Sequence, residues 1–223
     1  MRNLVGDLLP LALVVTVSPI NIVAAILLLF SKRPIANAAI YLLGFVLGVA
    51  AMLSGITALA DAIGIAPGSE RSQGASALLL ALGLVLIVVG VRKVSHRRGL
   101  EQEPDQPRWM KGIDDFGAGR SFLVGASVGA LNPKNIAVAF ATAVIVATAQ
   151  LPVGQQVGVI AIYTLIASLG VATPIVAALA LGDRSESVLS SWRQWLDRNS
   201  GTVMAVIFLF FGVLLLGKGI SGV

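Results

Sequence analysis

The chain has 223 residues, of which 57% are apolar and 12% charged, and its mean hydropathy is +0.91. Soluble domains carry about a quarter charged residues, so this composition indicates an integral membrane protein. Cysteine is absent and His96 is the single histidine, which excludes disulfides, thiolate metal sites and a histidine metal cluster. The net charge of +5 comes from basic residues between apolar segments, where membrane orientation explains them better than nucleic-acid binding.

Apolar runs long enough to cross a bilayer recur six times along the chain. They span Leu4–Phe30, Ala36–Leu59, Gly74–Val91, Ser121–Ala149, Val157–Leu181 and Gly201–Leu216. The first run is too long for a signal peptide and no small-residue cleavage site follows it. We therefore expect a retained first helix and six transmembrane spans.

A proline with an asparagine two residues later interrupts the first and the fourth run. The motifs are Ser18-Pro19-Ile20-Asn21 and Asn132-Pro133-Lys134-Asn135. Proline removes an amide donor and frees a carbonyl one turn back. Within a membrane such groups must be buried in protein or line a wet cavity. Breaks at matching positions in two halves of a chain point to the binding site of a transporter.

Two further prolines extend this match between the halves. Pro34 and Pro152 follow the ends of the first and fourth runs, and we expect both to act as helix stops.

The basic residues of the loops predict the orientation of the spans. Loops after the first, third and fifth runs hold Lys32, Arg33, Arg92, Lys93, Arg97, Arg98, Arg108, Lys111, Arg120, Arg184, Arg193 and Arg198. The other side holds Arg2, Arg71 and Lys218. Twelve against three places both termini outside the cytoplasm.

Three spans per half reverse the sense in which the second half enters the membrane. The sequence therefore predicts an all-α fold built as a 3+3 inverted repeat, in which a central site can face each side in turn. The first repeat covers residues 1–91 and the second covers 121–223. Residues 92–120 form a charged cytoplasmic linker.

Two stretches have the apolar spacing of short interfacial helices. One carries Trp109, Ile113 and Phe116 in the linker, and the other covers Val188–Leu196 with two tryptophans. We expect both to anchor the chain at the cytoplasmic membrane surface.

Lys134 is the only charged residue well inside a predicted span, and no carboxylate lies at a comparable depth. A buried ammonium needs a partner or an aqueous cavity. Beside two broken helices it predicts an anionic ligand group: carboxylate, phosphate or sulfate. Amides at the start of each second half-helix would add to this attraction. The alternative is that Lys134 binds carbonyls released by its own break and only stabilises the fold.

The other polar residues of the two motifs complete the predicted substrate-binding set. This set is Lys134, Asn135, Asn132, Asn21 and Ser18. The asparagines fit a capping role as well as a ligand role, and for Ser18 a cap is favoured.

The second run contains two glycines at four-residue spacing, Gly44 and Gly48, and a third glycine, Gly55, on the same side. Such spacing lets helices approach closely, either within one chain or in a homodimer. Pro174 is expected to kink the fifth span.

The run from Ser18 to Pro34, together with Asn132–Ala139, resembles the GAP family, the sulfolipid- and peptidoglycolipid-addressing (SfLAP) proteins of actinobacteria. That family is placed in the LysE exporter superfamily, and the resemblance covers essentially the whole chain. Ser18-Pro19 departs from the Pro-Gly-Pro of amino-acid exporters. The resemblance implies movement of envelope lipids or glycolipids at the bacterial plasma membrane.

Three functions follow as hypotheses. The first is a translocator of lipids or glycolipids with an anionic headgroup, which would use the site at Pro19 and Pro133. The second is an exporter of small amino acids or similar metabolites, and the third is a scaffold of a lipid-synthesis or export machine that transports nothing. No nucleotide-binding motif or midplane carboxylate supplies an energy source. Neither an enzyme nor a cofactor is expected, since the sequence shows no nucleophile–base pair or phosphate-binding loop.

Overall fold

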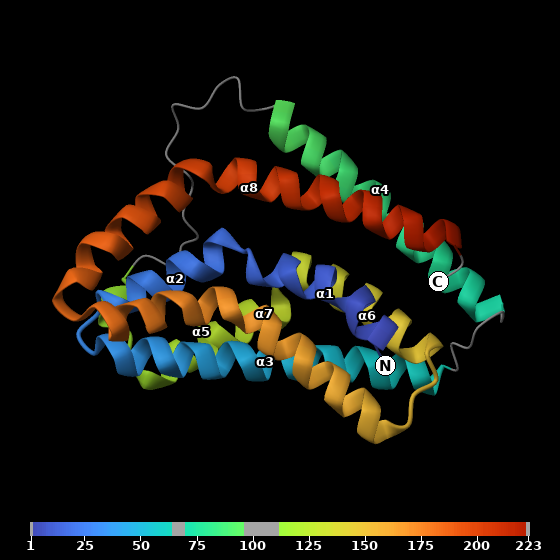
Figure 1. Ribbon diagram of the computed structural model, residues 1–223, viewed down its shortest axis with the longest axis horizontal. Helices are drawn as coiled ribbons and strands as arrows, with labels where there is room; N and C mark the ends of the chain where they lie inside the picture. Colours follow the sequence, from blue (N-terminus) through green and yellow to red (C-terminus); the bar gives the residue numbers. More distant parts are fainter. Residues whose placement is uncertain (1, 64–69, 96–111, 222–223) are drawn as a thin grey trace.

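The structure is a computed structural model that describes residues 2–63, 70–95 and 112–221, and it is helical with no strand in these ranges (Figure 1). The α-helices are α1 (Arg2–Thr16), α2 (Pro19–Leu29), α3 (Pro34–Ala62), α4 (Glu70–Ser95), α5 (Ala118–Leu131), α6 (Pro133–Thr148), α7 (Val153–Leu181) and α8 (Ser185–Ser221). Two 3-10 helices, η3 (Ile113–Asp115) and η4 (Gly182–Arg184), precede α5 and α8.

Both predicted breaks are present. The segment Leu8–Thr16 of α1 meets α2 at an angle of 45°, and α5 meets α6 at 55°. Pro19 and Pro133 each occupy the first position of the helix that follows the break. Proline suits that position because its missing N–H would have no partner within the helix.

The helices confirm an apolar membrane protein but do not by themselves give six spans. Among the described residues, three helical stretches are long and apolar enough to cross a membrane, or up to five if each bent pair is one span. One of the three stretches is Val153–Ser221, which contains both α7 and α8. The six-span inverted repeat therefore stays a prediction.

Three local predictions were wrong. Pro34 and Pro152 do not stop α2 and α6, which end several residues earlier; they stand at the starts of α3 and α7. Val188–Leu196 is not a separate interfacial helix, because α8 runs without interruption from Ser185. Ile113 lies in a 3-10 turn and is 2% exposed, so its side chain packs into protein rather than lipid. Trp109 and most of the linker lie outside the described residues.

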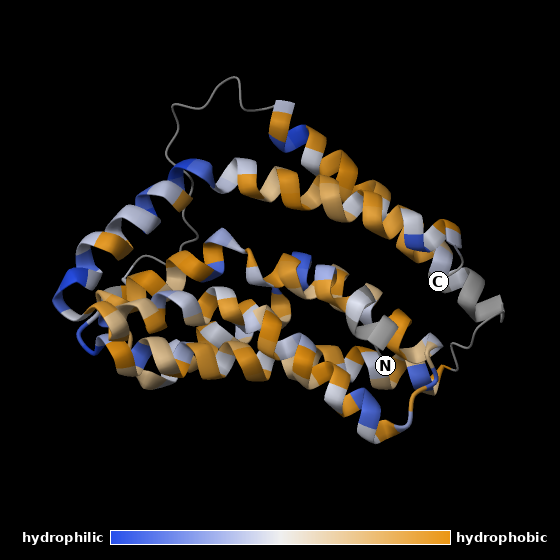
Figure 2. Cartoon of the chain, viewed as in Figure 1, coloured by the Kyte–Doolittle hydropathy of each residue, from blue (hydrophilic) through white to orange (hydrophobic). Residues whose placement is uncertain are grey.

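Each broken helix pair packs against the second helix of the other half. The helix α1 contacts α7, as α5 contacts α3, and α2 contacts α7, as α6 contacts α3. The last helices of the two halves, α4 and α8, pack along each other in a separate layer (Figure 1). Hydrophilic residues gather at the ends of the bundle, and its middle is mostly hydrophobic (Figure 2).

Glycines allow α3 and α5 to touch along their backbones. A Cβ added at Gly44 would collide with the Phe122 carbonyl, and one at Gly125 with the Tyr41 carbonyl. Gly55 has open space around it. Gly44, which could have served a homodimer contact, therefore packs against α5 inside this chain. The homodimer stays a prediction.

Candidate functional site

The first break leaves polar groups without partners. The Val17 N–H still donates to the Leu13 carbonyl at 2.9 Å, and the Ser18 carbonyl accepts the N–H groups of Asn21 and Ile22, both at 3.1 Å. Ser18 occupies the N-cap position, but its side chain makes no capping hydrogen bond. Ser18 and Asn21 are both 0% exposed. The Ser18 Oγ and both polar side-chain atoms of Asn21 have no hydrogen-bond partner.

The second break is better satisfied. Asn132 caps α6, since its Oδ1 accepts the backbone N–H of Lys134 at 3.1 Å. The Asn135 Nδ2 donates to the carbonyls of Val128 and Gly129, both at 3.1 Å, near the end of α5. The Asn135 Oδ1, which is buried, has no partner.

Lys134 joins the two breaks. Its Nζ donates to the Val14 carbonyl of α1 at 2.7 Å, and the residue is 6% exposed. Among the residues whose side-chain burial the structure describes, it is the only charged one that is buried. The sequence left open that Lys134 binds carbonyls released by its own break. Lys134 does bind a backbone carbonyl, but this carbonyl belongs to the other break. The carboxyl end of α1, where the helix dipole is negative, partly compensates the ammonium charge.

The Lys134 ammonium supplies the positive charge of the site. The ion pairs Lys32–Asp115 and Arg193–Asp197 involve other residues. The backbone N–H groups of Asn21 and Lys134 are already bonded within their own turns. Helix-start amides at these two positions therefore add less to anion binding than the sequence predicted. No group of three metal-ligating side chains occurs in the described ranges.

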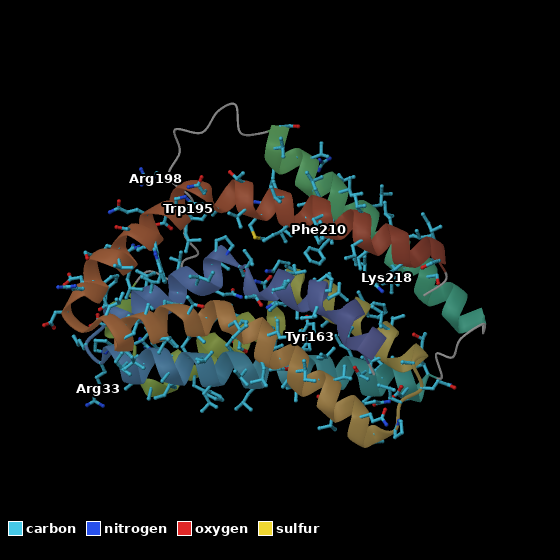
Figure 3. The ribbon with its side chains drawn as sticks, in the orientation of Figure 1. Arg33, Tyr163, Trp195, Arg198, Phe210 and Lys218 are labelled. Atoms are coloured by element: carbon cyan, nitrogen blue, oxygen red, sulfur yellow. The ribbon has the colours of Figure 1, made fainter. Side chains whose placement is uncertain are left out.

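Two neighbours of the site were missed from the sequence. The Tyr41 hydroxyl donates to the Asn21 backbone carbonyl at 3.4 Å, and the Thr16 hydroxyl donates to the Ile166 carbonyl at 2.6 Å. The chain has two tyrosines, and the second, Tyr163, lies on α7 inside the bundle (Figure 3). The sequence places one tyrosine in the second span of each half, and this match could have marked Tyr41 and Tyr163 as candidate site residues.

Polar contacts also join the first half to the end of the linker, at one end of the bundle. The Lys32 Nζ donates to Asp115 Oδ1 at 2.8 Å, and this bond raises the pKa of Lys32 and lowers the pKa of Asp115. The buried Asn37 donates to Ser31 Oγ at 2.9 Å and to the Phe116 carbonyl at 2.8 Å. Arg33 and Arg198 lie toward this end and Lys218 toward the opposite end (Figure 3).

A cavity of about 380 Å³ opens near the same end, between the junction of α2 and α3 and the junction of α7 and α8. Its walls combine apolar side chains with carboxylates. They include Leu29, Phe30, Ile35, Asp183, Glu186 and Leu189.

Apolar helices of spanning length, two broken helix pairs and a cationic centre between them define this chain as a polytopic membrane protein. The chain belongs to the SfLAP family (Sap, sulfolipid-1-addressing protein), whose model matches residues 8–221. This match confirms the resemblance seen in the two proline motifs, and membership implies a role in sulfolipid addressing. Comparisons with curated proteins and with solved structures gave no match.

Proposed function

We propose that this protein translocates an envelope lipid with an anionic headgroup across the plasma membrane, and that the headgroup binds between the two breaks. The observation that carries the proposal is the Lys134 ammonium, buried and bound to a backbone carbonyl of the opposite break, with no carboxylate partner in the part of the chain that the structure describes. A carbonyl compensates an ammonium only in part, so a phosphate or sulfate would be a stronger partner in the same place.

The unpaired groups nearby suit the rest of a polar headgroup. Ser18 Oγ and the side-chain oxygens of Asn21 and Asn135 are buried acceptors without donors. Buried acceptors of this kind are costly unless a ligand or water supplies the missing hydrogen bonds. Hydroxyl groups beside the anionic group would supply them.

Three features support a six-span inverted repeat as the frame of this site. The stretch Val153–Ser221 has 69 residues, about 100 Å of helix at about 1.5 Å per residue, against a hydrocarbon core of about 30 Å. Two crossings, α7 and α8, fit that length, and four more come from α3, α4 and the two bent pairs. The exchanged contacts of α1 with α7 and α5 with α3 match a two-fold relation of the halves. The third feature is the distribution of loop charges, which favours a topology with both termini outside the cytoplasm.

The cavity beside α2 offers the acyl part of the lipid a contact surface near the cytoplasmic leaflet, whereas its carboxylates at Asp183 and Glu186 disfavour the anionic headgroup itself. The helix α2 has 11 residues between Pro19 and the cavity wall at Leu29, which is about 15 Å at about 1.5 Å per residue. This distance is about half the thickness of the hydrocarbon core. The cavity then lies at the level of the lipid headgroups, and its apolar wall at Phe30 and Ile35 suits an acyl chain.

The test is transport in liposomes that contain the purified full-length protein. Three fluorescent lipids with the same acyl chains are compared: a sulfated glycolipid, a phosphatidylglycerol and a phosphatidylcholine. Chemical quenching from outside measures how fast each one changes leaflet. We expect the two anionic lipids to move at least about ten-fold faster than phosphatidylcholine, and Lys134→Met to abolish that difference.

The rival functions give different results. Equal rates for all three lipids, together with efflux of small amino acids from loaded liposomes, would identify a metabolite exporter. A scaffold would move neither class of compound; deleting the protein from cells would then alter envelope lipids, whereas Lys134→Met would leave them unchanged.

A further inference from the structure

The two breaks correspond residue by residue when the sequence is shifted by 114 positions. Pro19 then matches Pro133, and Asn21 matches Asn135. Lys134 matches Ile20, so only the second break carries a lysine. The carbonyls of Val14 and Val15 in α1 match those of Val128 and Gly129 in α5.

The corresponding carbonyls have different donors. In the second break Asn135 Nδ2 donates to Val128 and Gly129, the residues seven and six positions before it. In the first break, the residue seven positions before Asn21 is Val14, and its carbonyl receives the Lys134 Nζ. The Asn21 amide group is left fully buried with no partner for its Nδ2.

We propose that Asn21 is the alternative donor to the Val14 carbonyl, so that Lys134 and Asn21 exchange on this oxygen when Lys134 turns to an anionic group. This inference rests on the proposed function for the role of the anion, but the exchange itself is a property of the protein alone. In the state described here Lys134 holds the carbonyl. In the other state Asn21 holds it with the geometry that Asn135 already has.

The exchange lowers the cost of moving the lysine. A buried carbonyl without a donor costs free energy. If Lys134 broke its bond to the Val14 carbonyl with no replacement donor, this cost would reduce the affinity for the anion. A second donor that can reach the same oxygen, as Asn135 reaches the corresponding carbonyl of α5, would remove most of that cost. It also explains why a fully buried amide stays unpaired in one state, since buried polar groups are normally satisfied. In the exchange the Asn21 Nδ2 has a positioning role, because it acts through Lys134, while the Asn21 Oδ1 stays available to the headgroup.

A double-mutant cycle on thermal unfolding tests the exchange without any ligand. The full-length protein is purified in an uncharged maltoside detergent as wild type, Asn21→Leu, Lys134→Met and the double variant. In the wild-type background Asn21→Leu should leave Tm within about 1 °C or raise it, because it removes an unpaired amide. In the Lys134→Met background the same change should lower Tm by about 3 to 6 °C, because Asn21 has become the donor to Val14.

Equal effects of Asn21→Leu in the two backgrounds would overturn the exchange. Asn135→Leu is the matched control, since it removes an amide that already donates two hydrogen bonds. It should lower Tm in both backgrounds by the same amount.

A second measurement keeps Lys134 and adds an anion. Octyl phosphate below its micellar concentration should raise the Tm of the wild type, and octyltrimethylammonium should not. For Asn21→Leu the half-maximal concentration of octyl phosphate should increase about ten-fold, the change expected when one buried carbonyl loses its donor. An unchanged concentration would refute the exchange. Failure of octyl phosphate to act on the wild type would instead count against the proposed function and leave the cycle to decide the exchange.

Discussion

Replacing Lys134 by methionine separates a structural lysine from a ligand-binding one. The change removes the present donor to Val14. An unpaired buried carbonyl costs about 1 to 3 kcal/mol, and this cost is avoided where Asn21 takes over the bond as proposed. The change also removes an ammonium from a span, where insertion scales give a cost of about 2.5 to 3.5 kcal/mol. The net effect of Lys134→Met on stability therefore lies between a loss of about 0.5 kcal/mol and a gain of about 3.5 kcal/mol.

The variant should thus fold normally and lose its preference for anionic lipids. Thermal unfolding in detergent measures the first quantity, and leaflet exchange of the fluorescent lipids measures the second. Asn135→Leu provides the comparison, because it leaves two carbonyls without donors and removes only one unpaired acceptor, the Asn135 Oδ1, in return. A ligand-binding role of Lys134 is refuted if Lys134→Met lowers Tm as far as Asn135→Leu does while the remaining folded protein transports anionic lipids at the wild-type rate.

Other consequences of the structure can be checked directly. Gly125→Ala should lower Tm by several degrees, because its Cβ would meet the α3 backbone, whereas Gly55→Ala, which has open space, should leave Tm unchanged or raise it; an equal loss in both would contradict the close packing of α3 and α5. The bond from Lys32 holds the pKa of Asp115 below its ordinary value, so the pair stabilises the folded state above about pH 4 and this contribution is lost as the pH falls through the lowered pKa. The Tm difference between wild type and Asp115→Asn should therefore shrink as the pH falls from 5 to 3. This difference is small because the pair is exposed, and a difference that grows would refute a stabilising Lys32–Asp115 pair. Because the chain has no cysteine, single cysteines report its orientation: Asp61→Cys should react with an impermeant maleimide outside intact cells and Lys32→Cys only after permeabilisation, and the reverse pattern would invert the proposed topology.

The breaks were predictable because proline acts locally. Pro19 and Pro133 cannot donate a hydrogen bond wherever the rest of the chain lies, so the ends of α1 and α5 follow from the sequence. Asn132 likewise caps the helix that begins next to it. The capping prediction failed at Ser18, whose hydroxyl is buried without a bond, since rotamer and packing decide whether a residue at that position bonds the next turn.

The partner of Lys134 could not be predicted from the sequence. Burial cost shows that an ammonium in a span needs a partner, but the choice between its own break and the other depends on which helices touch. The contact of α1 with α6 decides it in favour of Val14. The role of Pro34 was mispredicted for a related reason. Proline follows the end of one helix as readily as it begins the next, and here α2 ends at Leu29 while α3 begins at Pro34.

The bond between Lys134 and Val14 also constrains how the protein is made. Donor and acceptor are 120 residues apart, and the acceptor comes first. During synthesis from the N-terminus, the carbonyl end of α1 is already in the membrane when the ribosome delivers the helix that carries the lysine. Insertion of that helix then has a waiting acceptor, which offsets part of the cost of bringing a charge into hydrocarbon. A chain that began after the first break would lack this acceptor, so we expect insertion of the second half to depend on the first.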